Sequence, residues 1–360
     1  MNANFWQGKR VFITGHTGFK GSWLSLWLQQ LGAYVTGYAL APPTTPSLFE
    51  MACVSNGMVS IEGDVRDLSS LKAAIAAHSP DIIFHMAAQS LVRYSYKNPV
   101  ETYATNVMGT VHLLESVRQV GGTRVVVNVT SDKCYKNQEW AWGYRENDAI
   151  GGYDPYSNSK ACAELVSSAY HSAYFHKASG GGDPGISLST VRAGNVIGGG
   201  DWSEDRLIPD IIRAFTAGEP VLIRSPNAIR PWQHVLEPLN GYLSLAEQMW
   251  AAGVDNAEGW NFGPEDSHAR SVSWIADQLT RLWGENASWR IDTNASPHEA
   301  TYLKLDCSKA KRRLQWSPTL ELSTALDWIV EWYRGYISEE NMHQATVAQI
   351  QRYELLIASR

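Results

Sequence analysis

The first half of the chain alternates short apolar segments with amphipathic ones, and this alternation restricts the folds that it can adopt. Residues 10–14 (RVFIT), 81–86 (DIIFHM) and 124–129 (RVVVNV) are apolar runs of strand length, as expected of strands buried on both faces. Strands that alternate with helices imply a parallel sheet covered on both sides. Strands are predicted at 10–14, 34–40, 59–62, 81–86, 124–129 and 186–196, and helices at 68–78, 99–120, 155–176 and 345–359.

The regular alternation weakens after about residue 197, which predicts a second region of different construction. We expect a dinucleotide-binding domain over 1–185, with later returns to it near 186–197 and 230–262. The remainder of 198–340 is predicted to form mainly a smaller, interleaved substrate-binding domain, followed by a C-terminal helix in 341–360.

A glycine-rich turn, residues 14–21 (TGHTGFKG), joins the first predicted strand to the first helix. Gly15, Gly18 and Gly21 can serve the tight turn, the approach of a pyrophosphate to the backbone, and close helix–strand packing. A phosphate-binding loop of the Walker A type requires Gly-Lys-Ser/Thr, and here Lys20 precedes Gly21. The turn therefore predicts an α/β fold of the Rossmann type, a doubly wound parallel sheet.

The sequence gives only weak evidence for which dinucleotide, NAD or NADP, is bound. Residues 37–41 (GYALA), at the end of the second strand, contain neither an acid for a ribose hydroxyl nor an arginine for a 2′-phosphate. Lys20 could reach such a phosphate, whereas Asp64, followed by Val65, could accept a hydrogen bond from adenine or act as a helix cap. NAD is expected, and NADP is not excluded.

Tyr156 and Lys160 are four residues apart on a predicted helix and therefore share one face. A nearby ammonium favours the phenolate, so Tyr156 could take a proton from a sugar hydroxyl while hydride leaves for a nicotinamide. Ser131 follows the fifth strand, at the sheet edge where ligands bind in such folds, and can share that proton.

These motifs, together with residues 86–89 (MAAQ), resemble the extended short-chain dehydrogenase/reductase family, and the resemblance covers most of the chain. The resemblance implies a catalytic triad of Ser131, Tyr156 and Lys160 beside the cofactor. The cofactor contacts that it implies are Gly15, Thr17, Gly18, Phe19, Lys20, Gly21, Asp64, Val65, Ala87, Ala88, Gln89, Asn106, Tyr156 and Lys160.

Residues 130–133 (TSDK) resemble the signature of sugar-nucleotide 4,6-dehydratases, most of which have Thr-Asp-Glu there. The lysine in place of glutamate is similar to the branch that acts on CDP-glucose, as are residues 192–202, 230–235 and 298–306. The resemblance implies a lyase that converts CDP-D-glucose to CDP-4-dehydro-6-deoxy-D-glucose and water, early in dideoxysugar (O-antigen or related glycan) biosynthesis. Asp132 would then be the acid and Lys133 the base of the elimination.

Other residues are assigned by their chemistry, and other functions stay open. Asn195 and Arg230 are candidates for the substrate phosphates, and Arg93, His234 and Tyr302 are further candidate substrate contacts. No metal site is predicted. The alternatives are a sugar-nucleotide 4-epimerase, a dehydratase of another nucleotide sugar and, in a different class, a non-catalytic NAD(P)-binding sensor.

Composition limits the partners and the compartment. A net charge of −6 does not suggest nucleic acid, no run of 18 apolar residues suggests a membrane span, and four scattered cysteines suit the cytoplasm. The family resemblance further implies a homodimer built on helices 99–120 and 155–176, which can pair into a homotetramer.

Overall fold

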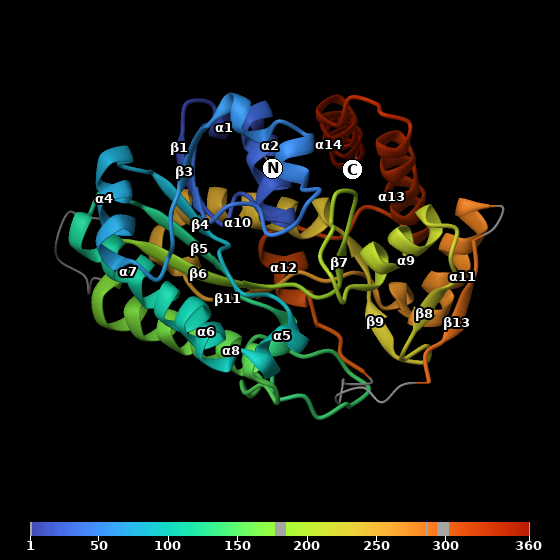
Figure 1. Ribbon diagram of the computed structural model, residues 1–360. Coiled ribbons are helices and arrows are strands. Elements are labelled where there is room, and N and C mark those ends of the chain that lie inside the picture. The colour runs from blue at the N-terminus through green and yellow to red at the C-terminus, as the bar shows by residue number, and fades with distance from the viewer. Residues whose placement is uncertain (1, 177–184, 285–286, 294–301, 360) are drawn as a thin grey trace.

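The computed structural model describes residues 2–176, 185–284, 287–293 and 302–359, and its centre is a seven-stranded sheet (Figure 1). The strand order is β3-β2-β1-β4-β5-β6-β11, and every neighbouring pair is parallel. The predicted doubly wound α/β fold is thereby confirmed. The strands are β1 (Arg10–Thr14), β2 (Tyr34–Ala39), β3 (Val59–Glu62), β4 (Ile82–His85), β5 (Val125–Val129), β6 (Ser187–Arg192) and β11 (Gly259–Asn261).

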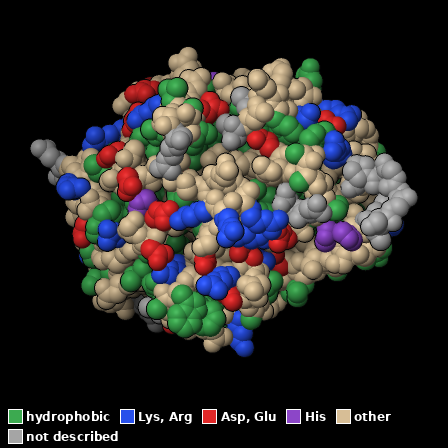
Figure 2. Space-filling model, turned by 180° about the vertical axis from the view of Figure 1, so that it is seen from behind, with side chains coloured by type: hydrophobic (Ala, Val, Ile, Leu, Met, Phe, Trp, Pro, Cys, Tyr) green, Lys and Arg blue, Asp and Glu red, His purple; other side chains and the backbone are tan. Residues whose placement is uncertain are grey.

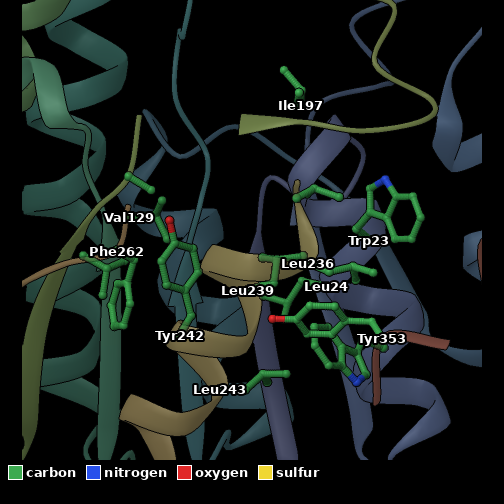
Figure 3. Packing of buried hydrophobic residues seen from close by; sticks show 14 of the residues in the cluster. Trp23, Leu24, Val129, Ile197, Leu236, Leu239, Tyr242, Leu243, Phe262 and Tyr353 are labelled. Atoms are coloured by element: carbon green, nitrogen blue, oxygen red, sulfur yellow. The ribbon is translucent and has the colours of Figure 1, made fainter. Parts of the chain in front are cut away.

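The strands are continuous runs of apolar residues, without alternating polar ones, because helices cover both faces of the sheet. Val11 and Ile13 of β1 enter one core, and Phe12 between them enters the other. On the first face, Leu239 of α10 lies beside Leu24 of α2 (Figure 3). The first face carries α2 (Phe19–Gln30), α10 (Leu236–Ala252) and α14 (Met342–Ala358), and the second carries α4 (Leu68–His78) and α7 (Gly109–Val120).

Two long predicted helices each contain one wider turn. The predicted helix 99–120 consists of α6 (Pro99–Tyr103), a π-helical turn at Ala104–Met108, and α7. The predicted helix 155–176 consists of α8 (Pro155–Tyr170) and a π-helical turn at His171–Phe175. Such turns are frequent at functional sites, and the first contains Asn106.

The prediction of one strand over 186–196 is wrong. The sheet strand β6 ends at Arg192, and a separate short strand, β7 (Val196–Ile197), pairs with β10 (Gln233–His234). Asn195, just before β7, has a φ of 41°, which a continuous strand does not allow. The chain therefore leaves the sheet after Arg192 and enters the second region.

The second region lies at one side of the sheet (Figure 1) and is built from short elements. It contains two further strand pairs, β8 (Val221–Ile223) with β13 (Trp289–Ile291) and β9 (Ile229–Pro231) with β12 (Ala269–Ser271). Its helices are α9 (Leu207–Thr216), α11 (Val272–Trp283), α12 (Ser308–Arg313) and α13 (Leu322–Ile337). Short helices that the sequence did not mark are α1 (Ala3–Trp6), α3 (Leu48–Met51) and α5 (Val92–Lys97).

The interleaving is visible in the sheet itself, since β11 returns to it after the first strands of the second region. The exact domain limits stay a prediction. Within the described residues, no helix is long and apolar enough to span a membrane. Basic and acidic side chains are intermixed on the face shown in Figure 2.

Candidate active site

A cavity of about 300 Å³ opens beyond the carboxyl end of β5, between the sheet and the second region. Its sheet side is formed by Lys20, Tyr156 and the three residues that follow Thr130. Its other side comes from residues 205–210, 221–225 and their neighbours in the second region. Ligands bind at this edge of parallel sheets, so the cavity is the candidate active site.

Tyr156 is fixed in the cavity by the first turn of α8. The side chain of Asp154 caps that helix by accepting a hydrogen bond from the backbone N–H of Ser157 (2.9 Å). Burial raises the pKa of Tyr156 to about 12, although the neighbouring Ser131 hydroxyl acts to lower it. The protein alone therefore keeps Tyr156 protonated at neutral pH.

Lys160 lies one turn further along α8 and is almost fully buried. Its Nζ donates a hydrogen bond to the carbonyl of Val129 (3.1 Å). Burial, with a smaller contribution from the charge of Lys20, lowers the pKa of Lys160 to about 8. The activation of Tyr156 by the Lys160 ammonium stays a prediction.

Asp132 and Lys133 both line the cavity because the chain turns directly after β5. Residues Asp132–Cys134 form a 3-10 turn. The backbone N–H of Lys133 in this turn donates a hydrogen bond to the Ser131 hydroxyl (3.2 Å). Asp132 is 2% exposed, and its Oδ1 accepts a hydrogen bond from Ser131 (3.1 Å). Its Oδ2 has no hydrogen-bond partner among the described residues.

The glycine turn fits a dinucleotide. Gly15 has a φ of 79°, and a Cβ there would lie 2.7 Å from the backbone nitrogen of Ala87. A Cβ on Gly21 would lie 2.1 Å from the carbonyl oxygen of Gly15, so the turn can close only with glycine. Gly18 precedes α2, and no side chain caps that helix. Its backbone N–H groups are therefore suited to a pyrophosphate.

Asn106 shapes the loop after β4. Its Oδ1 accepts a hydrogen bond from the Gln89 N–H (2.8 Å), and its Nδ2 donates to the Gln89 carbonyl (2.9 Å) and to Ser159 (2.8 Å). The predicted contact residues Ala87 and Ala88 belong to the same loop. In this structure Asn106 thus holds that loop beside the glycine turn.

Three predicted cofactor residues have other partners. The Asp64 carboxylate forms an ion pair with Arg66 (2.6 Å), and Val65 is buried against Gly109. Lys20 lines the cavity, where burial and the nearby charge of Arg206 lower its pKa to about 8. The suggested contact between Lys20 and a 2′-phosphate near the end of β2 is therefore not supported by its position.

The predicted substrate residues divide into two groups. Arg93, Asn195 and Arg230 line the cavity. His234 does not, because it is 1% exposed and lies in the core between the rings of Trp23 and Trp328. Its assignment as a substrate contact was wrong.

Tyr302 also lies outside the set of described residues that line the cavity. It is half-buried and pairs through its backbone with Ile229. Residues 298–301, the first part of a motif used in the sequence analysis, lie outside the described residues.

A buried ion pair that no sequence pattern had marked lies beneath the site. Arg192 at the end of β6 forms two hydrogen bonds with Glu164 of α8 (2.8 and 2.7 Å), and both side chains are less than 5% exposed. Glu164 also accepts a hydrogen bond from Thr190 (2.6 Å). Its spacing of four residues from Lys160 is a signal that could have identified it.

Two further residues were missed because long-range packing brings them to the site. Arg206 lines the cavity and is held by Asp201 (2.9 Å) and Ser90 (2.9 Å). Tyr242 of α10 is fully buried, and its hydroxyl points toward Val129 (Figure 3). Neither residue belongs to a motif recognisable in the sequence.

Comparison with known proteins agrees with this geometry. The chain is 58% identical over 353 residues to the CDP-glucose 4,6-dehydratase of Salmonella typhimurium, which covers 98% of each protein. The dTDP-glucose 4,6-dehydratase of Bacillus anthracis, solved in complex with NAD, superposes with a TM-score of 0.75 at 20% identity, covering 91% and 97% of the chains. The UDP-glucose 4-epimerase of Stenotrophomonas maltophila, solved with bound NAD, gives 0.79 at 20% identity, covering 92% and 99%.

The two solved structures show the shared fold, while the family follows from sequence. The model of the GDP-mannose 4,6 dehydratase family matches residues 12–328, which is most of the chain. The chain therefore belongs to the GDP-mannose 4,6 dehydratase family, within the extended short-chain dehydrogenase/reductases that its motifs resemble.

Proposed function

We propose that the protein is an NAD-dependent CDP-glucose 4,6-dehydratase that forms CDP-4-dehydro-6-deoxy-D-glucose and water. The observation that carries this proposal is that Asp132 and Lys133 line the same cavity as Tyr156. An acid and a base beside a redox centre are what a dehydration through a ketone requires. The 58% identity to a CDP-glucose 4,6-dehydratase supports the choice of substrate.

Bound NAD would accept a hydride from C4 of the sugar and later return it to C6. The first requirement on the protein is a base for the C4 hydroxyl, and Tyr156, which lines the cavity together with Ser131, is assigned to this role. Because burial raises the pKa of Tyr156 to about 12, the phenolate needs a positive charge beside it. The positively charged nicotinamide ring of bound NAD would supply such a charge, together with Lys160 on the same helix.

The ketone at C4 makes the C5 proton acidic, and the elimination then needs a base at C5 and an acid at the C6 hydroxyl. Lys133, on the cavity wall, is assigned as the base, and it must be neutral when it acts. Asp132, which lines the same cavity, is assigned as the acid. A sugar-nucleotide 4-epimerase would need neither group.

Substrate phosphates are assigned to the basic side of the cavity. Arg230, Arg93 and Asn195 line it, and a guanidinium suits a diphosphate because it donates two parallel hydrogen bonds. Arg206, held by Asp201, adds a fourth group that can face the substrate.

The experiment that tests the function is incubation of the purified protein and NAD with CDP-, dTDP-, UDP- and GDP-glucose. Mass spectrometry should show a product lighter by one water, formed fastest from CDP-glucose. An unchanged mass with altered stereochemistry would indicate an epimerase instead. Failure with CDP-glucose but dehydration of another substrate would refute the choice of nucleotide.

We further propose that the protein forms a homodimer, or a homotetramer made of two such dimers, through the outer face of α6, α7 and α8. Large apolar side chains are exposed on or next to these helices: Val100 of α6 (82%), Leu165 of α8 (61%) and Tyr174 in the π-helical turn that follows α8 (56%). Helices with such a face pack well against a second copy of themselves. A cytoplasmic location stays a prediction.

A further inference from the structure

The proposed elimination requires the segment Ser131–Cys134 to stay in one position relative to Tyr156, an argument that rests on the proposed function. The segment lies beyond the last residue of β5 and carries the assigned acid and base into the cavity. A misplacement of about 1 Å in a reacting group can cost about 10²-fold in rate, so the segment needs firm anchors. Its two flanking residues, Thr130 and Tyr135, are buried and are not among the described residues that line the cavity.

The residue before the segment is held by α8 and by β6. Oγ1 of Thr130 donates a hydrogen bond to Oε1 of Glu164 in α8 (2.5 Å), and the backbone N–H of Thr130 donates to the carbonyl of Val191 (2.9 Å). One turn earlier in α8, Nζ of Lys160 donates to the carbonyl of Val129 (3.1 Å). Two side chains of α8 thus bind the two consecutive residues that precede the segment.

The residue after the segment is held by Arg192. Its guanidinium donates a hydrogen bond to the Tyr135 hydroxyl (2.6 Å) and lies 4.9 Å from the centroid of the Tyr135 ring. The same Nη1 also donates to the carbonyl of Glu146 (3.0 Å). The Tyr135 hydroxyl in turn donates to Oδ1 of Asn261 in β11 (2.7 Å), so its direction is fixed on both sides.

The two anchors are bonded to each other. Arg192 donates two hydrogen bonds to the two carboxylate oxygens of Glu164 (2.8 and 2.7 Å), which fixes both distance and orientation. Burial acts to raise the pKa of Glu164, but the bonds and the charge of Arg192 lower it overall, so the carboxylate stays ionised. A buried ion pair adds little net stability, because desolvation offsets its attraction. Directed bonds to both ends of one segment are what this pair supplies.

We propose that Glu164 and Arg192 are positioning residues that hold the segment Ser131–Cys134 at both ends and so fix the acid and the base of the elimination relative to Tyr156. Because Glu164 and Tyr156 belong to the same helix, α8 becomes the common frame of the whole catalytic group. Neither member of the ion pair is among the described residues that line the cavity, so the pair acts through the two flanking residues.

The test removes one hydroxyl at a time, because deleting Glu164 or Arg192 leaves a buried charge without its partner and can unfold the protein. The variants are Thr130→Val and Tyr135→Phe, and Thr130→Ser restores the hydroxyl. Thr190→Val is the matched control, since Thr190 also donates to Glu164 (2.6 Å) but lies within β6, away from the segment. Thermal unfolding is measured for each variant, and all assays are made below the unfolding transition.

The dehydration of CDP-glucose should separate positioning from stability. Thr130→Val and Tyr135→Phe should each lower kcat by about 10- to 10²-fold, as expected when reacting groups shift by less than about 1 Å. The KM for CDP-glucose should change by less than about threefold, because the assigned phosphate contacts lie on other elements. Thr190→Val and Thr130→Ser should keep kcat within about threefold of wild type. A network that only stabilises the fold would instead lower the unfolding temperature and leave kcat unchanged in all four variants.

Two outcomes would overturn the proposal. The first is a folded Thr130→Val or Tyr135→Phe protein that keeps kcat within about threefold of wild type, as the control does. The second is a Thr130→Ser protein as slow as Thr130→Val, since the hydroxyl would then not be the group that matters. Wild-type protein that forms no dehydrated product refutes the proposed function itself, a result distinct from both.

Discussion

Gly194 offers the sharpest test of the position of Asp132, because a single methyl group there displaces the carboxylate. A Cβ on Gly194 would lie 1.9 Å from Oδ2 of Asp132 and 2.5 Å from its Cγ. Real Cβ contacts are essentially never shorter than 3.0 Å, so in Gly194→Ala the carboxylate must retreat by about 1 Å or more. A displacement of this size typically costs about 10²-fold in rate.

The loss of stability in Gly194→Ala should be small compared with the loss of activity. Gly194 does not have a left-handed backbone, so alanine is conformationally allowed and the cost is that of overpacking, about 1–3 kcal/mol. Gly335→Ala is the matched control, since the methyl there meets only the end of the Glu340 side chain, at 2.9 Å. Gly194→Ala should remain folded in thermal unfolding, whereas its kcat for dehydration falls about 10²-fold and that of Gly335→Ala is retained.

A double-variant cycle identifies the cause of the loss. If displacement of the acid explains it, Gly194→Ala should add little to Asp132→Asn, because both remove the same function. A folded Gly194→Ala protein with a kcat within about threefold of wild type would refute the reasoning. Asp132 would then not be the acid in the position that the structure gives it.

The remaining predictions concern the elimination, the pH dependence and the dimer. Asp132→Asn and Lys133→Met should each lower turnover by about 10²–10⁴-fold. Reduced nicotinamide should accumulate during a single turnover of these variants, whereas wild-type protein should show no lasting absorbance from reduced nicotinamide. Near-normal dehydration by Lys133→Met would show that Lys133 has a structural role only. Lys160, with its pKa lowered to about 8, is charged below that pH and neutral above it, so kcat/KM should fall as pH rises through about 8. Lys160→Arg should remove this alkaline limb, and a limb that persists in the variant would assign it to another group. Leu165→Glu, on the outer face of α8, should give a monomer by light scattering. The control Leu355→Glu, on α14 where the leucine is 72% exposed, should leave the oligomer intact. A wild-type monomer at micromolar concentration would exclude the dimer.

Local patterns in the sequence predicted much of this site because its central residues are close in the chain. Tyr156 and Lys160 share a helix face by spacing alone, and Ser131, Asp132 and Lys133 are consecutive after a strand. The open question was whether two adjacent residues could both face the cavity. The 3-10 turn at Asp132–Cys134 answers it, since it follows the end of β5 at Val129 after only Thr130 and Ser131, and both Asp132 and Lys133 line the cavity.

Residues that depend on tertiary packing could not be placed in this way. His234 belongs to a motif with Arg230 but lies in the core, because rings from α2 and α13 enclose it. Arg206 reaches the cavity only through its contacts with Asp201 and Ser90, which are distant in the chain from one another. The left-handed turn at Asn195 was missed because asparagine adopts both extended and left-handed backbones.

The position of β11 beside β6 has a consequence for synthesis of the protein on the ribosome. Residues 193–258 must be made after β6 before its partner β11 exists, which takes on the order of several seconds at about 5–20 residues per second. During that time the outer edge of β6 offers unpaired backbone groups next to apolar side chains, an arrangement prone to aggregation. A nascent chain that stalls in this interval is therefore expected to need a chaperone, whereas one that has passed Asn261 can close its sheet.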